Sequence, residues 1–72
     1  MTQSPSPLQR QRLRAGLSKA ELARRAGVDE TTVSRAENGK RVQAHKASLI
    51  AQAISKAVGE EFSSEDLGII TI

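Results

Sequence analysis

Apolar residues recur at helical spacing in short segments along the chain, and most of these segments end at a glycine. A glycine after the last apolar position commonly closes a helix, so the pattern predicts an all-α chain. The predicted helices span Leu8–Ala15, Lys19–Ala26, Glu30–Asn38 and His45–Val58, with one further helical turn at Ser63–Leu67. With 72 residues, the chain has room for one domain with a small core.

The second and third predicted helices meet at a very short turn. Ser18 and Glu21 have the spacing of a capping box, in which each side chain bonds the backbone amide of the other residue. Gly27 can take the left-handed conformation that closes a helix, and Asp29 is a favourable first residue for the next one. Val28 is the apolar residue between them. A turn this short sets two helices at a steep angle, which is typical of a DNA-binding helix-turn-helix.

The third predicted helix has one apolar side and one polar side. Val33 and Ala36 would face the core. The outward positions are Glu30, Thr31, Ser34, Arg35 and Asn38. Such a face could enter the major groove of duplex DNA and contact base edges.

Composition excludes several other classes of function. The chain has no cysteine and a single histidine, His45, so we expect no metal site and no cofactor. Phe62 is the only aromatic residue, which argues against proteins that stack single-stranded bases on exposed rings. No nucleophile and base stand in a recognisable arrangement, so we do not expect an enzyme. Double-stranded DNA remains the favoured partner.

The charge is distributed unevenly along the chain. Residues 1–58 carry all 11 Lys and Arg with four acids, a net charge of +7, whereas residues 59–72 carry four acids and a charge of −4. A basic body followed by an acidic end favours a polyanion as partner of the body alone. A basic surface that is merely solvated would give the same charge. The helix-turn-helix pattern favours a nucleic-acid partner over this alternative.

The ends of the chain differ from the helical body. Residues 1–7 are rich in Pro and Ser and predict a disordered tail; residues 8–67 form the helix-turn-helix domain; residues 68–72 form an apolar tail. No apolar run approaches the roughly 20 residues of a membrane span, and the start lacks the features of a signal peptide. We therefore expect no membrane association and a cytoplasmic protein, associated with the nucleoid when bound to DNA.

Residues 8–67 resemble the Cro/XRE family of phage-repressor helix-turn-helix proteins. The resemblance rests on Arg12, Gly16-Leu17-Ser18, Glu21-Leu22-Ala23, Gly27-Val28, Val33-Ser34, Glu37-Asn38-Gly39-Lys40 and Ala57-Val58-Gly59. It implies a compact bundle of about five short helices around one core. It also implies an ion pair between Arg12 and Glu37 that supports the DNA-reading helix from behind.

The resemblance also assigns contacts with DNA. It places Glu30, Thr31 and Arg35 at base edges, and the types fit, since arginine can bond guanine, glutamate cytosine and threonine the thymine methyl. The positions that it places at the groove margin or at phosphates are Lys19, Thr32, Ser34, Asn38, Lys40 and Arg41. Lys19 departs from the family, which often has glutamine there, and a lysine favours a phosphate contact.

One such module reads few base pairs, so we expect a homodimer on a palindromic operator, acting as a transcriptional repressor. The candidate dimer interface comprises Phe62, Leu67, Ile69, Ile70 and Ile72. The alternative is that this apolar end folds back over the core of the same chain. A second reading of the whole protein is an interaction module that binds a protein partner through its acidic, apolar C-terminal region, with DNA binding secondary. Phage repressors, antitoxins and restriction-modification controllers remain open as subclasses.

Overall fold

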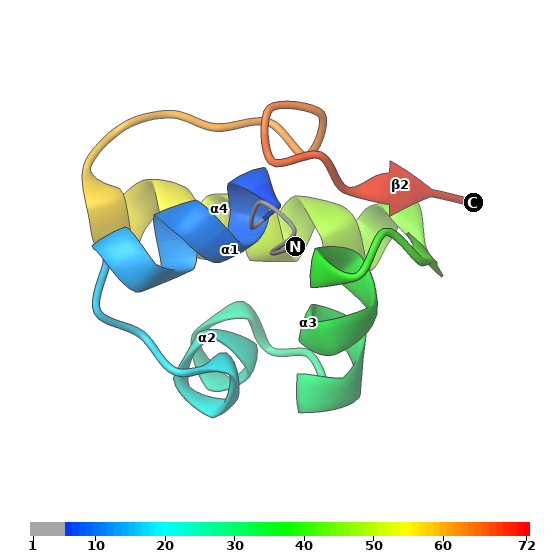
Figure 1. Ribbon diagram of the computed structural model, residues 1–72, viewed down its shortest axis with the longest axis horizontal. Helices are drawn as coiled ribbons and strands as arrows, with labels where there is room; N and C mark the ends of the chain where they lie inside the picture. Colours follow the sequence, from blue (N-terminus) through cyan, green and yellow to red (C-terminus); the bar gives the residue numbers. More distant parts are fainter. Residues whose placement is uncertain (1–5) are drawn as a thin grey trace, which may run out of the picture.

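The computed structural model describes residues 6–72. Its helices are α1 (Pro7–Arg14), α2 (Lys19–Ala26), α3 (Glu30–Glu37) and α4 (Ala44–Val58). Two short strands, β1 (Arg41–Val42) and β2 (Ile70–Thr71), complete the elements of this range. In Figure 1, α1 and α4 lie together on one side of the molecule and α2 and α3 on the other. The structure confirms a small, mainly helical fold.

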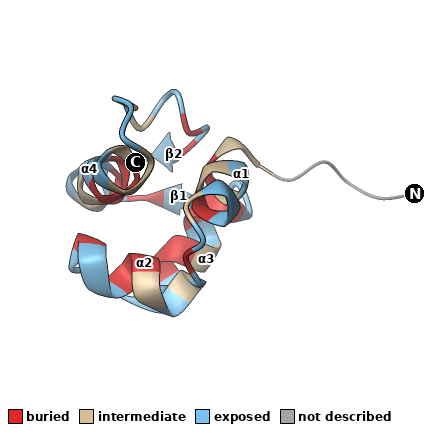
Figure 2. Cartoon of the chain, turned by 90° about the vertical axis from the view of Figure 1, so that its left-hand side faces the viewer, coloured by how far each residue is buried: buried red, intermediate tan, exposed pale blue. Residues whose placement is uncertain are grey.

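One hydrophobic core lies between these two pairs of helices (Figure 2). Its largest fully buried side chains are Leu8, Leu22, Val33, Ile50, Ile54 and Leu67. They come from all four helices and from the segment after α4, so the core ties the whole described chain together. The buried faces of α2 and α3 therefore fix the position of both helices of the helix-turn-helix.

The local signals predicted at the start of α2 and at its turn into α3 are present in the structure. The Ser18 hydroxyl accepts from the Glu21 amide and the Glu21 carboxylate accepts from the Ser18 amide, each at 3.0 Å. Gly27 ends α2 with φ +74°, a left-handed conformation that a side chain would strain. Asp29 precedes α3 as expected, although its side chain makes no capping hydrogen bond.

The further helical turn predicted at Ser63–Leu67 is present as a single turn over residues 64–68. The Ser63 hydroxyl accepts from the Asp66 amide at 3.1 Å, and the Asp66 carboxylate accepts from the Ser63 amide at 2.9 Å. The capping signature is therefore present, but Gly68 at φ +69° ends the segment after one turn. The bundle has four helices in its described part, not about five.

The chain after this turn folds back onto the same molecule, as the alternative expectation held. β2 pairs in parallel with β1, so that Arg41 lies opposite Ile70 and Val42 opposite Thr71. Lys40–Ala44 was expected to be a loop, and residues 68–72 were expected to form a separate apolar tail. Both expectations are corrected, because each segment contains one of the two paired strands. Two-residue strands are too short to show an alternating pattern, so periodicity could not reveal them.

The amino-terminal boundary also moves. Residues 1–5 of the expected tail lie outside the described residues, but Pro7 is the first residue of α1 and Ser6 is its N-cap. The Ser6 hydroxyl accepts from the Gln9 amide at 3.1 Å, and proline is favourable in a first helical turn because its missing amide has no partner there.

Candidate nucleic-acid interface

A buried ion pair holds α3 against α1. Arg12 Nε donates to Glu37 Oε2 at 2.6 Å and Arg12 Nη2 donates to Glu37 Oε1 at 3.2 Å. The third nitrogen, Nη1, donates to the carbonyl oxygen of Leu17 at 2.9 Å, so all three guanidinium nitrogens are engaged. A two-point bond of this kind fixes orientation as well as distance. The pair lies on the inner side of α3, which leaves the opposite side of that helix free.

The outer side of α3 carries the residues expected to contact base edges. Glu30, Thr31 and Arg35 are exposed, as is Asn38 just after the helix, and Ser34 is half-buried. They lie on one continuous polar surface, because Val33 and Ala36 turn inward into the core. The structure thus gives α3 a polar face that no other element of the described chain covers.

Thr32 does not lie on this outer face. It is only 8% exposed and shares the inward side of α3 with Val33 and Ala36. Thr32 nevertheless lines the open hollow beside Arg35 and Arg41, at the edge between the inward and outward sides of α3. The expectation that Thr32 lies at the groove margin therefore stays a prediction.

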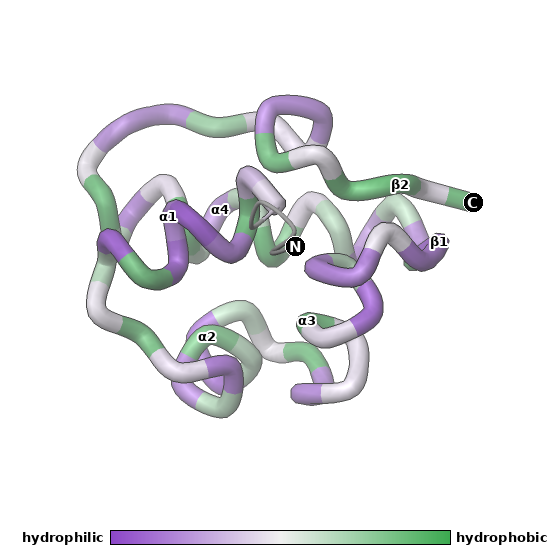
Figure 3. Tube along the Cα trace, in the orientation of Figure 1, coloured by the Kyte–Doolittle hydropathy of each residue, from purple (hydrophilic) through white to green (hydrophobic). Residues whose placement is uncertain are grey.

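Basic side chains flank the polar face of α3. Lys19 opens α2 and is half-buried, while Lys40 and Arg41 are exposed in the segment that joins α3 to β1. This joining segment is hydrophilic, whereas β2 beside it is largely hydrophobic (Figure 3). Exposed or half-buried cations therefore stand at both ends of the helix-turn-helix, at the start of α2 and after α3.

A hollow of about 250 Å³ adjoins these residues between α3, β1 and the start of α4. Its charged lining comprises Arg35, Arg41 and Lys46, and the other lining residues are Thr32, Val42, Gln43 and Ile72. The first amides of a helix lack partners within that helix, so the start of α4 adds partial positive charge to the three cations. Sequence reasoning missed Gln43 and Lys46, because the start of this helix carried no clear capping signal.

Arg35 is also bonded to the strand that follows its helix. Its Nη2 donates to the carbonyl oxygen of Arg41 at 3.2 Å. The Lys40 amide donates to the carbonyl oxygen of Arg35 at 2.9 Å, and this bond helps to end α3. Backbone and side chain of Arg35 are thus both tied to the segment that leads into β1.

Two carboxylates outside the α3 face carry structural charges. Hydrogen bonds from the backbone amide and the hydroxyl of Ser18 hold the pKa of Glu21 below its ordinary value of 4.5. Ser63 lowers the pKa of Asp66 below 3.8 in the same way. Both carboxylates are ionised near neutral pH and serve to close their turns.

Comparison with known protein families identifies the family to which this helix-turn-helix belongs. A family model described as helix-turn-helix matches residues 8–60, which cover α1 to α4 and the turn between α2 and α3. The chain belongs to the Cro/C1-type helix-turn-helix family, also called XRE. No curated protein and no solved structure matches it. The match confirms the family that the sequence motifs indicated, and it makes the protein a DNA-binding regulator of transcription. Such domains are not normally enzymes.

The candidate dimer contacts of this helix-turn-helix protein lie in two different environments. Leu67 is 1% exposed and Ile69 is 6% exposed, and both belong to the core of their own chain. Phe62 is half-buried and packs against that core. The Leu8 amide donates to the carbonyl oxygen of Leu67 at 3.1 Å, which fastens this segment to α1. Leu67 and Ile69 are therefore corrected from dimer contacts to core residues, whereas the assignment of Phe62 to the interface stays a prediction because its side chain is only half-buried.

Ile70 and Ile72 are the exposed candidates from that set. They are 47% and 79% exposed, and they flank Thr71 at the end of β2. Exposed β-branched residues next to a strand edge are candidates for contact with another protein chain.

Residues 6–72 contain no helix that is long and apolar enough to cross a membrane.

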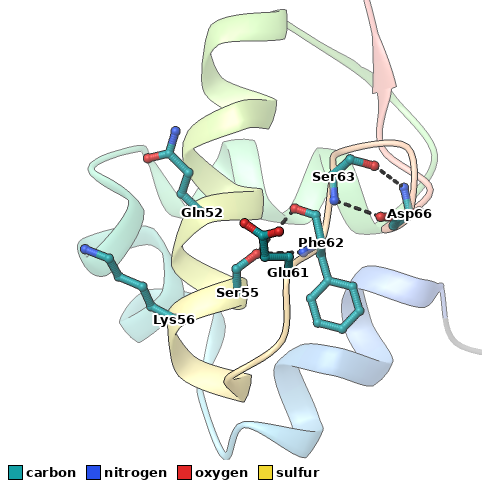
Figure 4. A pocket seen from close by; sticks show the side chains of 7 residues that line it. All are labelled: Gln52, Ser55, Lys56, Glu61, Phe62, Ser63 and Asp66. Carbon is teal, nitrogen blue, oxygen red and sulfur yellow. Dashed lines mark hydrogen bonds between the residues drawn. The ribbon is translucent and has the colours of Figure 1, made fainter.

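A second hollow, of about 620 Å³, lies between α4 and the segment after it (Figure 4). Ser55 Oγ accepts from the Phe62 amide at 2.9 Å and donates to the carbonyl oxygen of Ala51 at 2.7 Å. The phenyl ring of Phe62 points away from Gln52 and Lys56. The hydrogen bonds drawn in this hollow thus fasten the chain after α4 to the helix.

Proposed function

We propose that this protein is a transcriptional repressor that acts at the nucleoid by binding a palindromic operator as a homodimer. The observation that carries the proposal is the exposed polar face of α3, with Glu30, Thr31 and Arg35 between the flanking cations. The buried pair of Arg12 and Glu37 holds that face in a fixed orientation from behind. Rigid presentation of a polar helix is what reading bases in a groove requires.

The dimensions of α3 fit the groove that it would enter. Its eight residues span about 12 Å, close to the roughly 12 Å width of the major groove of B-form DNA. Arg35 can donate two hydrogen bonds to the O6 and N7 of guanine, Glu30 can accept from the cytosine amino group, and Thr31 can contact a thymine methyl. Ser34 and Asn38 would lie at the edge of the groove.

Phosphate contacts would position the helix in the groove. Lys19 would bind the backbone at one end of the motif, and Lys40 with Arg41 at the other. Gln43 and Lys46 join the second group, because the hollow that they line opens between α3 and the start of α4. Asn38, exposed at the end of α3, would reach the same strand.

A dimer follows from the small number of base pairs that one α3 can read. Two copies related by a two-fold axis would place two α3 helices about one helical turn of DNA apart. The exposed side chains of Ile70 and Ile72 at the edge of β2 are the apolar contacts that we assign to this dimer. A two-fold symmetric site in a binding-site selection is the result that this assembly predicts, and occlusion of a promoter by the dimer would repress transcription.

The proposal is tested by comparing the loss of a base contact with the loss of a phosphate contact. Arg35→Ala should cost about 1 to 3 kcal/mol on the operator and relax the preference at one base position. Lys40→Ala should weaken binding to operator and random DNA alike and reduce the salt dependence. Fluorescence anisotropy with labelled duplexes at several salt concentrations measures both effects.

Arg24→Ala is the matched control, because Arg24 is an exposed arginine on α2 and no hydrogen bond of its side chain is present in residues 6–72. It should change neither the base preference nor the affinity beyond the general charge effect. If Arg35→Ala weakens operator and random DNA by the same factor, the assignment of Arg35 to a base is wrong.

A further inference from the structure

β2 lies directly beside the segment that carries the phosphate-binding cations (Figure 1). Its register with β1 places Ile70 opposite Arg41 and Thr71 opposite Val42. The Ile72 amide donates to the carbonyl oxygen of Val42 at 3.0 Å, which extends the pairing by one residue. The last residues of the chain thus determine where β1 lies, although they are far from α3 in sequence.

The alternation of a strand then decides which way each carbonyl of β1 faces. Successive residues in a strand direct their amide and carbonyl groups to opposite edges. Because the Val42 carbonyl faces β2, the Arg41 carbonyl faces the other edge, where it accepts from Arg35 Nη2 at 3.2 Å. Pairing with β2 therefore directs the acceptor of Arg41 toward α3.

Apart from its bond to Arg41, the guanidinium of Arg35 has few interactions that would keep it in one orientation. It is exposed, and its bond to the Arg41 carbonyl is the only side-chain hydrogen bond that it makes within residues 6–72. An exposed arginine without a partner samples many rotamers, and ordering it on binding lowers affinity. The bond uses one guanidinium nitrogen, and the other N–H donors remain available to a base.

We propose that β2 is a positioning element for base recognition. By pairing with β1 it holds the Arg41 carbonyl in place, and that carbonyl preorients the Arg35 guanidinium before DNA is bound. This inference rests on the proposed function, in which Arg35 contacts a base. A regulator that loses the pairing of β2 keeps its fold and its phosphate contacts but discriminates less well at the base that Arg35 reads.

The test removes the strand pairing without removing core residues. Ile70 and Ile72 share one orientation in the strand, so both amides face β1, while both side chains are exposed. The double variant Ile70→Pro with Ile72→Pro removes both donors. The readout is the ratio of affinities for the selected operator and for an operator changed at the Arg35 position.

We expect this ratio to fall by about two- to twelvefold, the factor that corresponds to ordering one long side chain. Ile70→Ala with Ile72→Ala is the matched control, since it removes the same side chains and keeps both amides. Because Ile70 and Ile72 are also the assigned dimer contacts, the alanine control measures any change in the ratio that comes from lost dimerisation, and the proline variant should lower the ratio further than this control does. If the double proline variant melts at a much lower temperature, Ile72→Pro alone, which removes the bond to Val42, gives the same test with a smaller effect.

A mutant cycle separates positioning from general destabilisation. In an Arg35→Ala background the proline changes should leave the ratio unchanged, because the group that they position is gone. The inference is overturned if the ratio is unaffected by the prolines while Arg35→Ala lowers it, or if the alanine control lowers it equally. If Arg35→Ala itself leaves the ratio unchanged, the assignment of Arg35 to a base fails, and this inference fails with it.

Discussion

Arg12 shows how one side chain can fix the orientation of a DNA-facing helix. Its guanidinium bonds Glu37 on α3 and the carbonyl of Leu17 before α2, so a single group joins three parts of the fold. Within residues 6–72, every fully buried side-chain nitrogen or oxygen has a hydrogen-bond partner. A buried charge that is fully paired is tolerated, whereas one that loses its partner is strongly unfavourable.

Arg12→Ala should therefore lower the free energy of unfolding by about 3 to 5 kcal/mol, because it leaves the Glu37 carboxylate buried and unpaired. Chemical denaturation measures this loss. Arg14→Ala is the matched control: the Arg14–Glu60 pair is at 3.3 Å, and its side chains are 55% and 53% exposed. Breaking that pair should change the free energy of unfolding by at most about 1 kcal/mol. Equal effects of the two substitutions would contradict the role given to Arg12.

Individual residues differ in how far the sequence could place them. The outward positions Glu30, Thr31 and Arg35 follow from helical spacing, and the structure leaves all three exposed. Thr32 is nearly buried yet lines the hollow beside Arg35, and helical spacing alone could not decide how far the packing of α3 would cover it. Periodicity alone could not pair Arg12 with Glu37, since they are 25 residues apart, and the family resemblance supplied that pair.

At the scale of elements, the sequence predicted the ends of the four helices to within one residue. Serine caps and glycine stops are local signals, so Ser18 and Gly27 mark the ends of α2 without knowledge of the rest of the fold. The single turn at Ser63–Leu67 was predicted from its local capping signature, whereas the two strands were missed because they depend on contacts across the molecule. β1 exists only because β2, about 30 residues later, lies beside it.

The two caps of the helix-turn-helix should differ in strength. Ser18→Ala should destabilise the protein by about 1 kcal/mol, because the hydroxyl accepts from the Glu21 amide. Asp29→Ala should cost less, because the Asp29 side chain makes no capping hydrogen bond and retains only its charge near the start of α3. Thermal melts at neutral pH compare the two variants, and a larger loss for Asp29→Ala would contradict the observed capping.

At the scale of the whole molecule, the apolar end of the chain serves mainly its own fold. Leu67 and Ile69 complete the core, and only Ile70 and Ile72 are left as large exposed apolar residues near the C-terminal end. Sequence could identify these residues as apolar but could not decide between the chain's own core and a second chain. That choice depends on where β1 lies, which is a property of the folded molecule.

The charge of the whole molecule is consistent with a DNA partner for its helical body. All 11 basic residues belong to residues 1–58, whereas residues 59–72 carry four acids and no basic residue. Long-range attraction would bring the body of the protein to DNA without selecting a sequence, and this attraction weakens as salt rises. In the proposed function, base selection comes from α3.

The most direct test of this central claim is selection from a library of random duplexes with the full 72-residue chain at about 0.15 M salt, where nonspecific binding is weakened. Parallel selection with Arg35→Ala serves as the comparison. The account predicts a two-fold symmetric site for the natural chain, and loss of preference at one position in each half-site for the variant. Recovery of no motif, with binding that declines smoothly as salt rises, would contradict it.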